Sequence, residues 1–204
     1  AERLRRALDV DRAVVHYRVS ATIDGGGRMS YETWETAGRS LTLADEGNGV
    51  VEWATDGRTT SYWSPRRRLI VSSRRPADGV GPAGPTLAQI ADGLRRGTVT
   101  AREATFEGRD MIAAETPKGL TLFDAATYRP VALVFGATDR SGASTALDLE
   151  GPQVVVYRYD GYRVEQPTPA SLAQVDLAAR HPGARQVVDE RLFGVVVGEL
   201  YPNG

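Results

Sequence analysis

The sequence predicts an α+β domain built on a curved antiparallel sheet with a few short helices. Three observations lead to this fold class. Apolar and polar residues alternate over many short runs, as in strands that bury one face. Turn-forming pairs, such as Asp56-Gly57 and Glu107-Gly108, separate these runs. Helical periodicity is confined to three short stretches, near residues 1–8, 86–97 and 170–180.

The predicted strands of the first half include a hairpin that carries two of the three tryptophans. Val14–Ile23 alternates with period two. Two further strands follow, over Met29–Ala37 and Ser40–Ala44. The stretch Val50–Val71 then contains three apolar runs. We expect a type I′ turn at Asp56-Gly57, with positive φ at both residues.

A short amphipathic helix is expected midway along the chain. Thr86 fits its N-cap, Gln89 completes a capping box, and Gly97 suits the position after the helix. The preceding stretch, Ser73–Pro85, holds three prolines and three glycines. These residues exclude a helix or strand interior, so we expect a loop that gates the space under the helix.

The strand pattern resumes after this helix. Strands are expected over Val99–Phe106, Arg109–Glu115, Leu120–Phe123, Val131–Phe135, Ala146–Leu149 and Gln153–Tyr162. A single helix is expected over Ala170–Arg180, and an apolar segment, Leu192–Tyr201, closes the chain. We treat residues 1–204 as a single domain, with 166–204 as an extension of unassigned role.

Composition excludes several classes of protein. The chain has 204 residues and a net charge of −1, so no overall basic field recruits nucleic acid. It has no cysteine, which excludes disulfides and thiolate metal sites. No apolar run approaches the length of about 18 residues that spans a bilayer. We expect any contact with a membrane to depend on a removed signal or anchor.

The sequence carries no recognisable catalytic or metal-binding signature. The motifs of serine hydrolases, zinc proteases, phosphate-binding loops and dinucleotide-binding folds are all missing. His16 and His181 lack the neighbours of a catalytic triad or a metal site, so we expect structural roles for both. We therefore predict a protein that is not an enzyme and needs no cofactor.

The aromatic residues of the first half have two interpretations. Packing in the core is the commoner one. Alternatively, an open curved sheet with few helices leaves a cavity for acyl chains, because each buried methylene contributes about 0.8 kcal/mol. The candidates for lining such a cavity are Trp34, Trp53, Trp63, Leu87, Ile90 and Leu94.

The basic run Arg66, Arg67 and Arg68 also has two interpretations. Charged side chains beside a short strand protect a sheet edge from pairing with other chains. The same arginines are candidates for binding an anionic head group at the opening of an apolar cavity.

Three turn motifs resemble those of the LolA-like superfamily. Asp56–Pro65 resembles its hairpin, Phe106–Ile112 its mid-chain strand turn, and Leu122–Val131 its strand-turn-strand with Asp, Thr and Pro. The resemblance covers about residues 1–165. The superfamily includes periplasmic lipoprotein carriers, RseB-like regulators of anti-sigma factors and mycobacterial lipid-carrying lipoproteins. The arginine-proline-glycine segment of the carriers is missing, since Gly38–Leu43 contains no proline.

The resemblance implies an incomplete, half-open β-barrel with short helices over its concave face. It implies a non-enzymatic domain of the periplasm or cell envelope that binds lipid, an acyl chain or an acylated protein in its cavity. The missing carrier segment counts against delivery of lipoproteins to an outer membrane. The alternative is a protein-interaction or sensor domain of an envelope-stress regulator, with an anti-sigma factor or a membrane protein as partner.

Overall fold

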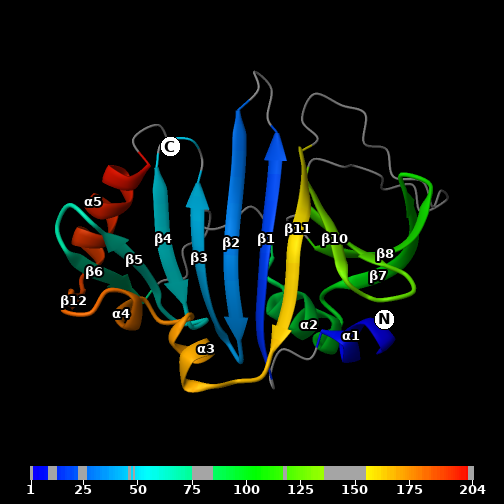
Figure 1. Cartoon of the computed structure of the whole chain (residues 1–204), viewed down its shortest axis with the longest axis horizontal. Coiled ribbons are helices and arrows are strands. Elements are labelled where there is room, and N and C mark those ends of the chain that lie inside the picture. Colours follow the sequence, from blue (N-terminus) through cyan, green and yellow to red (C-terminus); the bar gives the residue numbers. More distant parts are fainter. Residues whose placement is uncertain are drawn as a thin grey trace. The chain divides into compact units, whose positions relative to one another are not determined.

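The computed structural model describes residues 2–8, 13–22, 27–45, 47, 49–74, 85–116, 119–135 and 155–201. Hydrogen bonding orders the strands in one sheet of twelve, β12-β6-β5-β4-β3-β2-β1-β11-β10-β9-β8-β7 (Figure 1). This order has two ends, β12 and β7, so the described strands form an open sheet and not a closed barrel. The predicted open, largely antiparallel sheet with short helices is therefore confirmed.

The chain divides into two compact units. Unit 1 comprises Ala1–Asp9, Tyr17–Ser30 and Ala83–Tyr162, and unit 2 comprises Val10–His16, Tyr31–Pro82 and Arg163–Gly204. Three strands contribute residues to both units, β1 (Val14–Thr22), β2 (Arg28–Thr36) and β11 (Val155–Glu165). One domain over residues 1–204 stays a prediction. Most of the predicted gating loop Ser73–Pro85 and the predicted strand Ala146–Leu149 lie outside the described residues.

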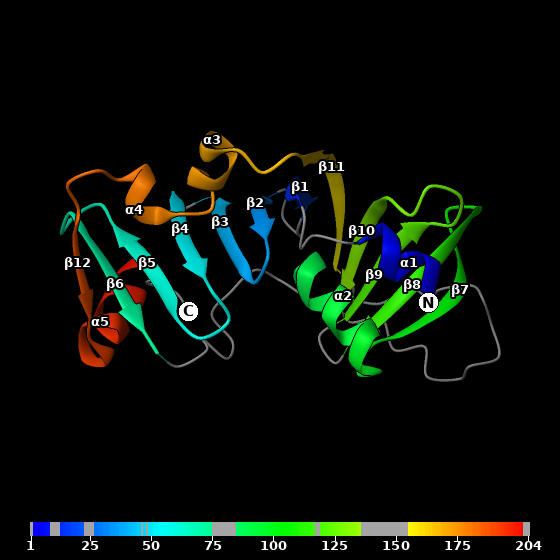
Figure 2. The ribbon, with the colours of Figure 1, turned by 90° about the horizontal axis from the view of Figure 1, so that it is seen from below.

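Unit 1 is an antiparallel meander with two helices. Its strands besides the shared ones are β7 (Thr100–Phe106), β8 (Arg109–Thr116), β9 (Gly119–Asp124) and β10 (Pro130–Phe135). Each of these strands pairs antiparallel with the next, and β10 pairs with β11. The helices α1 (Glu2–Ala7) and α2 (Leu87–Arg96) contact each other (Figure 2). One face of the meander buries a cluster that includes Phe106, Met111, Leu122 and Val134.

The hairpin between β7 and β8 has the turn that its sequence favours. Glu107 and Gly108 both have positive φ, at 51° and 73°. Because Phe106 pairs with Arg109, these two residues alone form the loop. Two residues at positive φ in a two-residue loop define a type I′ turn, which matches the twist of antiparallel strands. The turn predicted at Glu107-Gly108 is confirmed.

Asp124 organises the connection between β9 and β10. Its Oδ1 accepts hydrogen bonds from the backbone N–H groups of Ala126 and Thr127 at 3.1 and 2.8 Å. The hydroxyl of Thr127 donates to the same oxygen at 2.9 Å. These bonds, above all the backbone bond from Thr127, hold the pKa of the Asp124 carboxyl below its usual range. The aspartate and threonine of this motif therefore specify the turn.

Helix α2 begins and ends where the sequence predicts. Thr86 Oγ1 accepts a hydrogen bond from the N–H of Gln89 at 3.2 Å. Gln89 Oε1 accepts one from the N–H of Thr86 at 3.0 Å, which completes the capping box. Gly97 follows the helix with φ 72°, a conformation that glycine adopts without steric cost. The side chains of Leu87 and Ile90 are fully buried.

Unit 2 is a sheet with a C-terminal segment, residues 166–201, on both of its faces. Its own strands are β3 (Arg39–Asp45), β4 (Val50–Thr55), β5 (Thr60–Ser64) and β6 (Leu69–Ser73), paired antiparallel in this order. The C-terminal segment contains α3 (Pro169–Ala173), α4 (Leu177–Arg180), β12 (Arg185–Val188) and α5 (Glu190–Leu200). Strand β12 pairs parallel with β6. Figure 2 shows α4 and α5 on opposite sides of these strands.

The hairpin between β4 and β5 is present, but the predicted type I′ turn at Asp56-Gly57 is wrong. The N–H of Asp56 donates to the carbonyl oxygen of Thr59 at 3.2 Å, so Gly57 and Arg58 form the tip of the loop between Thr55 and Thr60. Within this loop only Gly57 has positive φ, at 81°. Oδ1 of Asp56 accepts hydrogen bonds from the N–H groups of Arg58 and Thr59 at 2.9 and 2.8 Å. This local capping by the aspartate moves the turn one residue toward the C-terminus.

The predicted single helix over Ala170–Arg180 is also wrong, because α3 and α4 are separate helices. Helix α3 ends with Gln174 as its C-cap, and Asp176 is the N-cap of α4. Oδ1 of Asp176 accepts a hydrogen bond from the N–H of Ala178 at 2.8 Å. An N-cap residue has extended backbone, so this aspartate interrupts the helical pattern.

Candidate functional site

Cross-strand pairing assigns the predicted site residues of unit 2 to two opposite faces. Trp53 pairs with Tyr62, and Tyr62 pairs with Val71, so these three side chains share one face. Trp63 pairs with Ile70, one position farther along, so it lies on the other face. We call these the α5 face and the α4 face, after the helices that cover them. The tryptophans of the hairpin therefore do not line one common surface.

The α4 face carries Trp34 and Trp63. Both are half-buried and pack against the buried cluster of Leu41, Ile70 and Leu177. Since Leu177 belongs to α4, the C-terminal segment completes this core. The commoner interpretation, packing in the core, therefore accounts for much of the surface of these two rings.

Both histidines have structural partners on this face. Nε2 of His16 lies 2.8 Å from Oε1 of Glu32, and its ring stacks on Trp34 with centroids 4.7 Å apart. The ring of His181 stacks on Trp63 with centroids 4.0 Å apart. Planar stacking of this kind adds about 0.5–1.5 kcal/mol to the burial of the rings.

Arg180 and His181 attach the end of α4 to strand β4. Nε2 of His181 lies 3.0 Å from Oε2 of Glu52, and Nε of Arg180 donates to the same oxygen at 3.3 Å. Nη1 of Arg180 donates to Oε1 of Gln174 at 3.3 Å. The Arg180 guanidinium also lies 5.4 Å from the centroid of the Trp34 ring. These contacts fix both side chains at the surface of the α4 face.

The α5 face is covered by helix α5. Tyr62 is fully buried. Its ring lies 6.0 Å from Trp53, 5.4 Å from Phe193 and 6.4 Å from Tyr201, measured between centroids. Phe193 and Tyr201 belong to the C-terminal segment, so that segment also completes the core on this side.

Helix α5 is held at both of its ends. At its start, Glu190 accepts hydrogen bonds from the hydroxyl of Ser73 at 2.6 Å and from the N–H of Arg74 at 2.9 Å. At its end, Glu199 forms a two-pronged ion pair with Arg67, whose Nε lies 3.0 Å from Oε2. Arg67, one of the predicted head-group candidates, is therefore engaged within the protein.

The ion pair of Arg67 makes the attachment of α5 sensitive to pH. Hydrogen bonding from Arg67 holds the pKa of the Glu199 carboxyl below its usual value of 4.5. A carboxyl with a lowered pKa stabilises the fold above the pKa of the unfolded chain, and this contribution is lost as the pH falls through the folded pKa. We expect the urea midpoint of Glu199→Gln to lie below that of the wild type at pH 7, and the difference between the two midpoints to be smaller at pH 3.

The exposed Glu103 of β7 provides a matched control for this prediction. Glu103→Gln should leave the urea midpoint close to that of the wild type at both pH values. A difference between Glu199→Gln and the wild type that is as large at pH 3 as at pH 7 would contradict the assignment to this ion pair.

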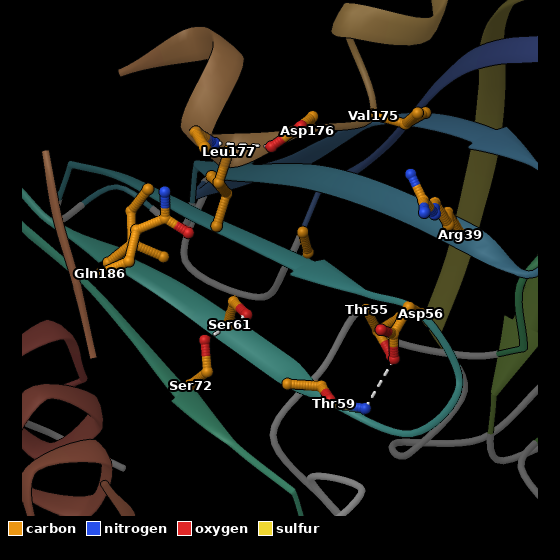
Figure 3. A pocket seen from close by; sticks show the side chains of 13 residues that line it. Arg39, Thr55, Asp56, Thr59, Ser61, Ser72, Val175, Asp176, Leu177 and Gln186 are labelled. Atoms are coloured by element: carbon orange, nitrogen blue, oxygen red, sulfur yellow. Dashed lines mark hydrogen bonds between the residues drawn. The ribbon is translucent and has the colours of Figure 1, made fainter. Parts of the chain in front are cut away.

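Two pockets open on the α4 face. The first, the hydroxyl pocket, has a volume of about 190 Å³. It is lined by Arg39, Ala54, Thr55, Asp56, Thr59, Ser61, Ile70, Ser72, Val175, Asp176, Leu177, Ala178 and Gln186. Figure 3 shows Ser61 and Ser72 directed toward each other, and their hydroxyl oxygens lie 2.7 Å apart. The pocket therefore offers hydroxyl, amide and charged groups around a small apolar floor.

The second pocket, the cationic pocket, has a volume of about 410 Å³. It is lined by Trp63, Pro65, Arg68, Arg180, His181, Pro182 and Ala184. Only Arg68 of the three predicted head-group candidates lines it. Sequence reasoning missed Arg180 and His181, because no local pattern places the end of α4 beside the turn between β5 and β6.

The predicted cavity residues of unit 1 are buried by the protein itself. Leu87 and Ile90 have no exposed surface, and Leu94 is half-buried. A ligand can reach Leu87 or Ile90 only if α2 moves. A role for the six apolar candidates in lining a lipid cavity stays a prediction.

Within the described ranges, no group of three or more His, Asp or Glu side chains could hold a metal ion. None of the described helices has the length and apolar character needed to cross a membrane.

No protein-family model and no curated protein matches the chain. Among solved structures, an uncharacterized conserved protein from Thermus thermophilus is similar, with a TM-score of 0.53 and 12% identity over 92% of this chain and 96% of that chain. MucB is similar with a TM-score of 0.45 and 14% identity over 92% of this chain and 65% of MucB. A putative outer membrane lipoprotein-sorting protein domain from Vibrio parahaemolyticus has a TM-score of 0.39 and 13% identity, with coverages of 82% and 92%.

The resemblance is one of fold. The Thermus thermophilus protein, with 12% identity and a TM-score of 0.53, shares the fold, and its description names no activity or ligand.

Proposed function

We propose that this chain is a non-enzymatic, extracytoplasmic binding domain whose ligand is a segment of a partner protein. The observation that carries the proposal is the pair of open pockets on the α4 face. Hydroxyl, amide, arginine, proline and tryptophan groups line them, and such groups recognise the polar backbone and mixed side chains of a peptide. The hydrocarbon of an acyl chain has no group that could hydrogen-bond with them.

The polar groups of the pockets are engaged in ways that favour binding over catalysis. Ser61 and Ser72 hydrogen-bond to each other, and Nε2 of His181 is directed to Glu52. A hydrolytic site needs a nucleophile in hydrogen-bond contact with its base. We therefore keep the prediction that the protein is not an enzyme, and we propose no cofactor.

The partner follows from the family resemblance. It would be an envelope protein, either a lipoprotein or the extracytoplasmic part of a regulator such as an anti-sigma factor. The periplasm or cell envelope is accordingly the proposed location. The interaction domain, which was the alternative to a lipid carrier, becomes the leading interpretation because Leu87 and Ile90 are closed to ligand.

Binding of an acyl chain under α2 is the second candidate. The observation in its favour is the amphipathic character of α2, whose apolar side chains Leu87 and Ile90 face away from water. Displacement of α2 would expose both, and a buried chain of about ten methylenes would gain roughly 8 kcal/mol before ordering costs.

A binding screen separates the two candidates. Overlapping peptides from the extracytoplasmic parts of envelope proteins, and a fluorescent hexadecanoate, are titrated against the whole chain by fluorescence anisotropy. We expect saturable binding of a subset of peptides and no saturable binding of hexadecanoate. Saturable binding of hexadecanoate alone would sink the proposal.

A substitution in the hydroxyl pocket locates the binding. Ser61→Tyr places a ring in the pocket and is expected to weaken the best peptides at least 10-fold. Thr105→Tyr, at a half-buried position of the edge strand β7, is the matched control and should bind as the wild type does. Equal losses of peptide affinity in both variants would show that the peptide does not bind in the hydroxyl pocket of the α4 face.

A further inference from the structure

The cationic pocket has rigid walls that come from two distant parts of the chain. The turn from Pro65 to Arg68 forms one wall, and its Arg68 carbonyl accepts a hydrogen bond from the N–H of Arg185 at 3.3 Å. The stretch from His181 to Ala184 forms the other wall, and the N–H of Ala184 donates to the His181 carbonyl at 3.0 Å. Both walls are thus fixed before a ligand arrives, which lowers the entropic cost of binding.

The side chain of Arg68 is available to a ligand. It is exposed and, unlike the Arg68 backbone, forms no hydrogen bond or ion pair within the described part of the chain. Its φ of 48° lies in the left-handed region, where an arginine costs more than a glycine would. The neighbouring Arg67, in contrast, forms an ion pair with Glu199. The arginine cluster therefore divides into a structural member and a pocket member.

The charges at the pocket are suited to a single negative charge. Arg68 and Arg180 each contribute +1, and Glu52, hydrogen-bonded to Arg180 and His181, contributes −1. These three charged groups together give a net charge of +1. A carboxylate matches this charge, and the planar guanidinium of Arg68 can bind it through two parallel hydrogen bonds.

The remaining walls are apolar. Trp63, Pro65, Pro182 and Ala184 line the pocket around the cations. Proline and tryptophan walls exclude water from the side of a ligand that is not charged, and they suit an aromatic or proline side chain next to the carboxylate.

We propose that the cationic pocket binds an acidic side chain of the partner, flanked in the partner's sequence by an aromatic residue or a proline. Arg68 pairs with the carboxylate, Arg180 adds to the positive field, and the flanking side chain lies against Trp63 and the two prolines. This inference rests on the proposed function, because it takes the ligand to be a peptide.

The capped pentapeptide acetyl-Gly-Phe-Asp-Pro-Gly-amide is the probe, titrated into the whole chain while the indole N–H signals are followed by NMR. We expect saturable binding, at least a 10-fold loss when the probe carries Asn in place of Asp, and a loss of 10- to 100-fold in Arg68→Gln, as for a charged hydrogen bond. Arg66→Gln is the matched control, since Arg66 is exposed in the same turn but does not line the pocket. It should bind as the wild type does.

Each other outcome overturns the inference. Equal affinity for the Asp and Asn probes would show that the pocket does not recognise the carboxylate. Equal losses of affinity in Arg66→Gln and Arg68→Gln would show that the general positive charge of the turn, and not the pocket, attracts the probe. Arg68-dependent binding to phosphatidylglycerol vesicles or to inorganic phosphate, without binding of the probe, assigns the pocket to a different anion. If peptides from the envelope screen bind independently of Arg68, this inference fails while the proposed function stands.

Discussion

Deleting the residues after Glu165 is expected to unfold unit 2. The deletion removes Leu177 from the core with Leu41 and Ile70 on the α4 face. It also exposes Tyr62 on the α5 face and removes β12, the strand that pairs with β6. A sheet that loses the cover on both faces cannot retain enough buried apolar surface to stay folded.

Hydrogen exchange followed by mass spectrometry checks this expectation. The amides of β4, β5 and β6 should lose their protection in the shortened chain. The amides of β7 to β10, in the same sample, serve as the internal reference and should keep theirs. Unchanged protection in β4 to β6 would mean that the sheet is stable without the C-terminal segment.

Tyr62→Ala is expected to lower the free energy of unfolding by about 3–5 kcal/mol, the usual cost of removing a large buried aromatic ring. The ring of Tyr62 is fully buried and contacts Trp53 from β4 as well as Phe193 and Tyr201 from the C-terminal segment. Its loss therefore weakens both the sheet and the attachment of α5. Urea unfolding followed by far-UV circular dichroism gives the measurement.

Tyr62→Phe is the matched variant, because it keeps the ring and changes only the hydroxyl. It should cost much less than Tyr62→Ala, because the buried ring and its contacts with Trp53, Phe193 and Tyr201 remain. A loss below about 1 kcal/mol in Tyr62→Ala would show that α5 does not depend on this ring.

Much of the fold could be predicted because its turns are specified by local chemistry. Glu107-Gly108 and the aspartate at 124 determine their turns through φ preference and side-chain hydrogen bonds within a few residues. The capping box of α2 is equally local. At Asp56-Gly57 two local devices compete, and the side-chain capping by Asp56 prevails over the type I′ turn that the pair usually favours.

The site could not be predicted in the same way, because it depends on contacts between distant segments. Trp53 and Trp63 lie on opposite faces because the register of the hairpin pairs Trp53 with Tyr62, and alternation along the sequence reveals neither this register nor the segment that covers each face. The sequence offers no sign that Leu177 and Phe193 reach these two faces. The predicted cavity placed both tryptophans on one surface, whereas strand pairing places them on opposite faces, each covered by a different part of the C-terminal segment.

The partners of the three consecutive arginines could not be predicted from the sequence either. The three arginines look equivalent in sequence, but Arg67 forms an ion pair with Glu199, whereas Arg68 lines a pocket together with the end of α4. Because partners for exposed charges come from anywhere in the fold, a run of like charges locates a surface and not a site.

Native mass spectrometry of the whole chain tests the central claim, that the α4 face binds protein and no internal cavity holds lipid. The chain is purified from a lipid-containing host, and then mixed with equal amounts of hexadecanoate and the best peptide of the envelope screen. We expect a one-to-one complex with the peptide, lost in Ser61→Tyr, and no mass that corresponds to bound lipid. A chain that retains lipid through purification, or takes up hexadecanoate in preference to the peptide, would contradict the account.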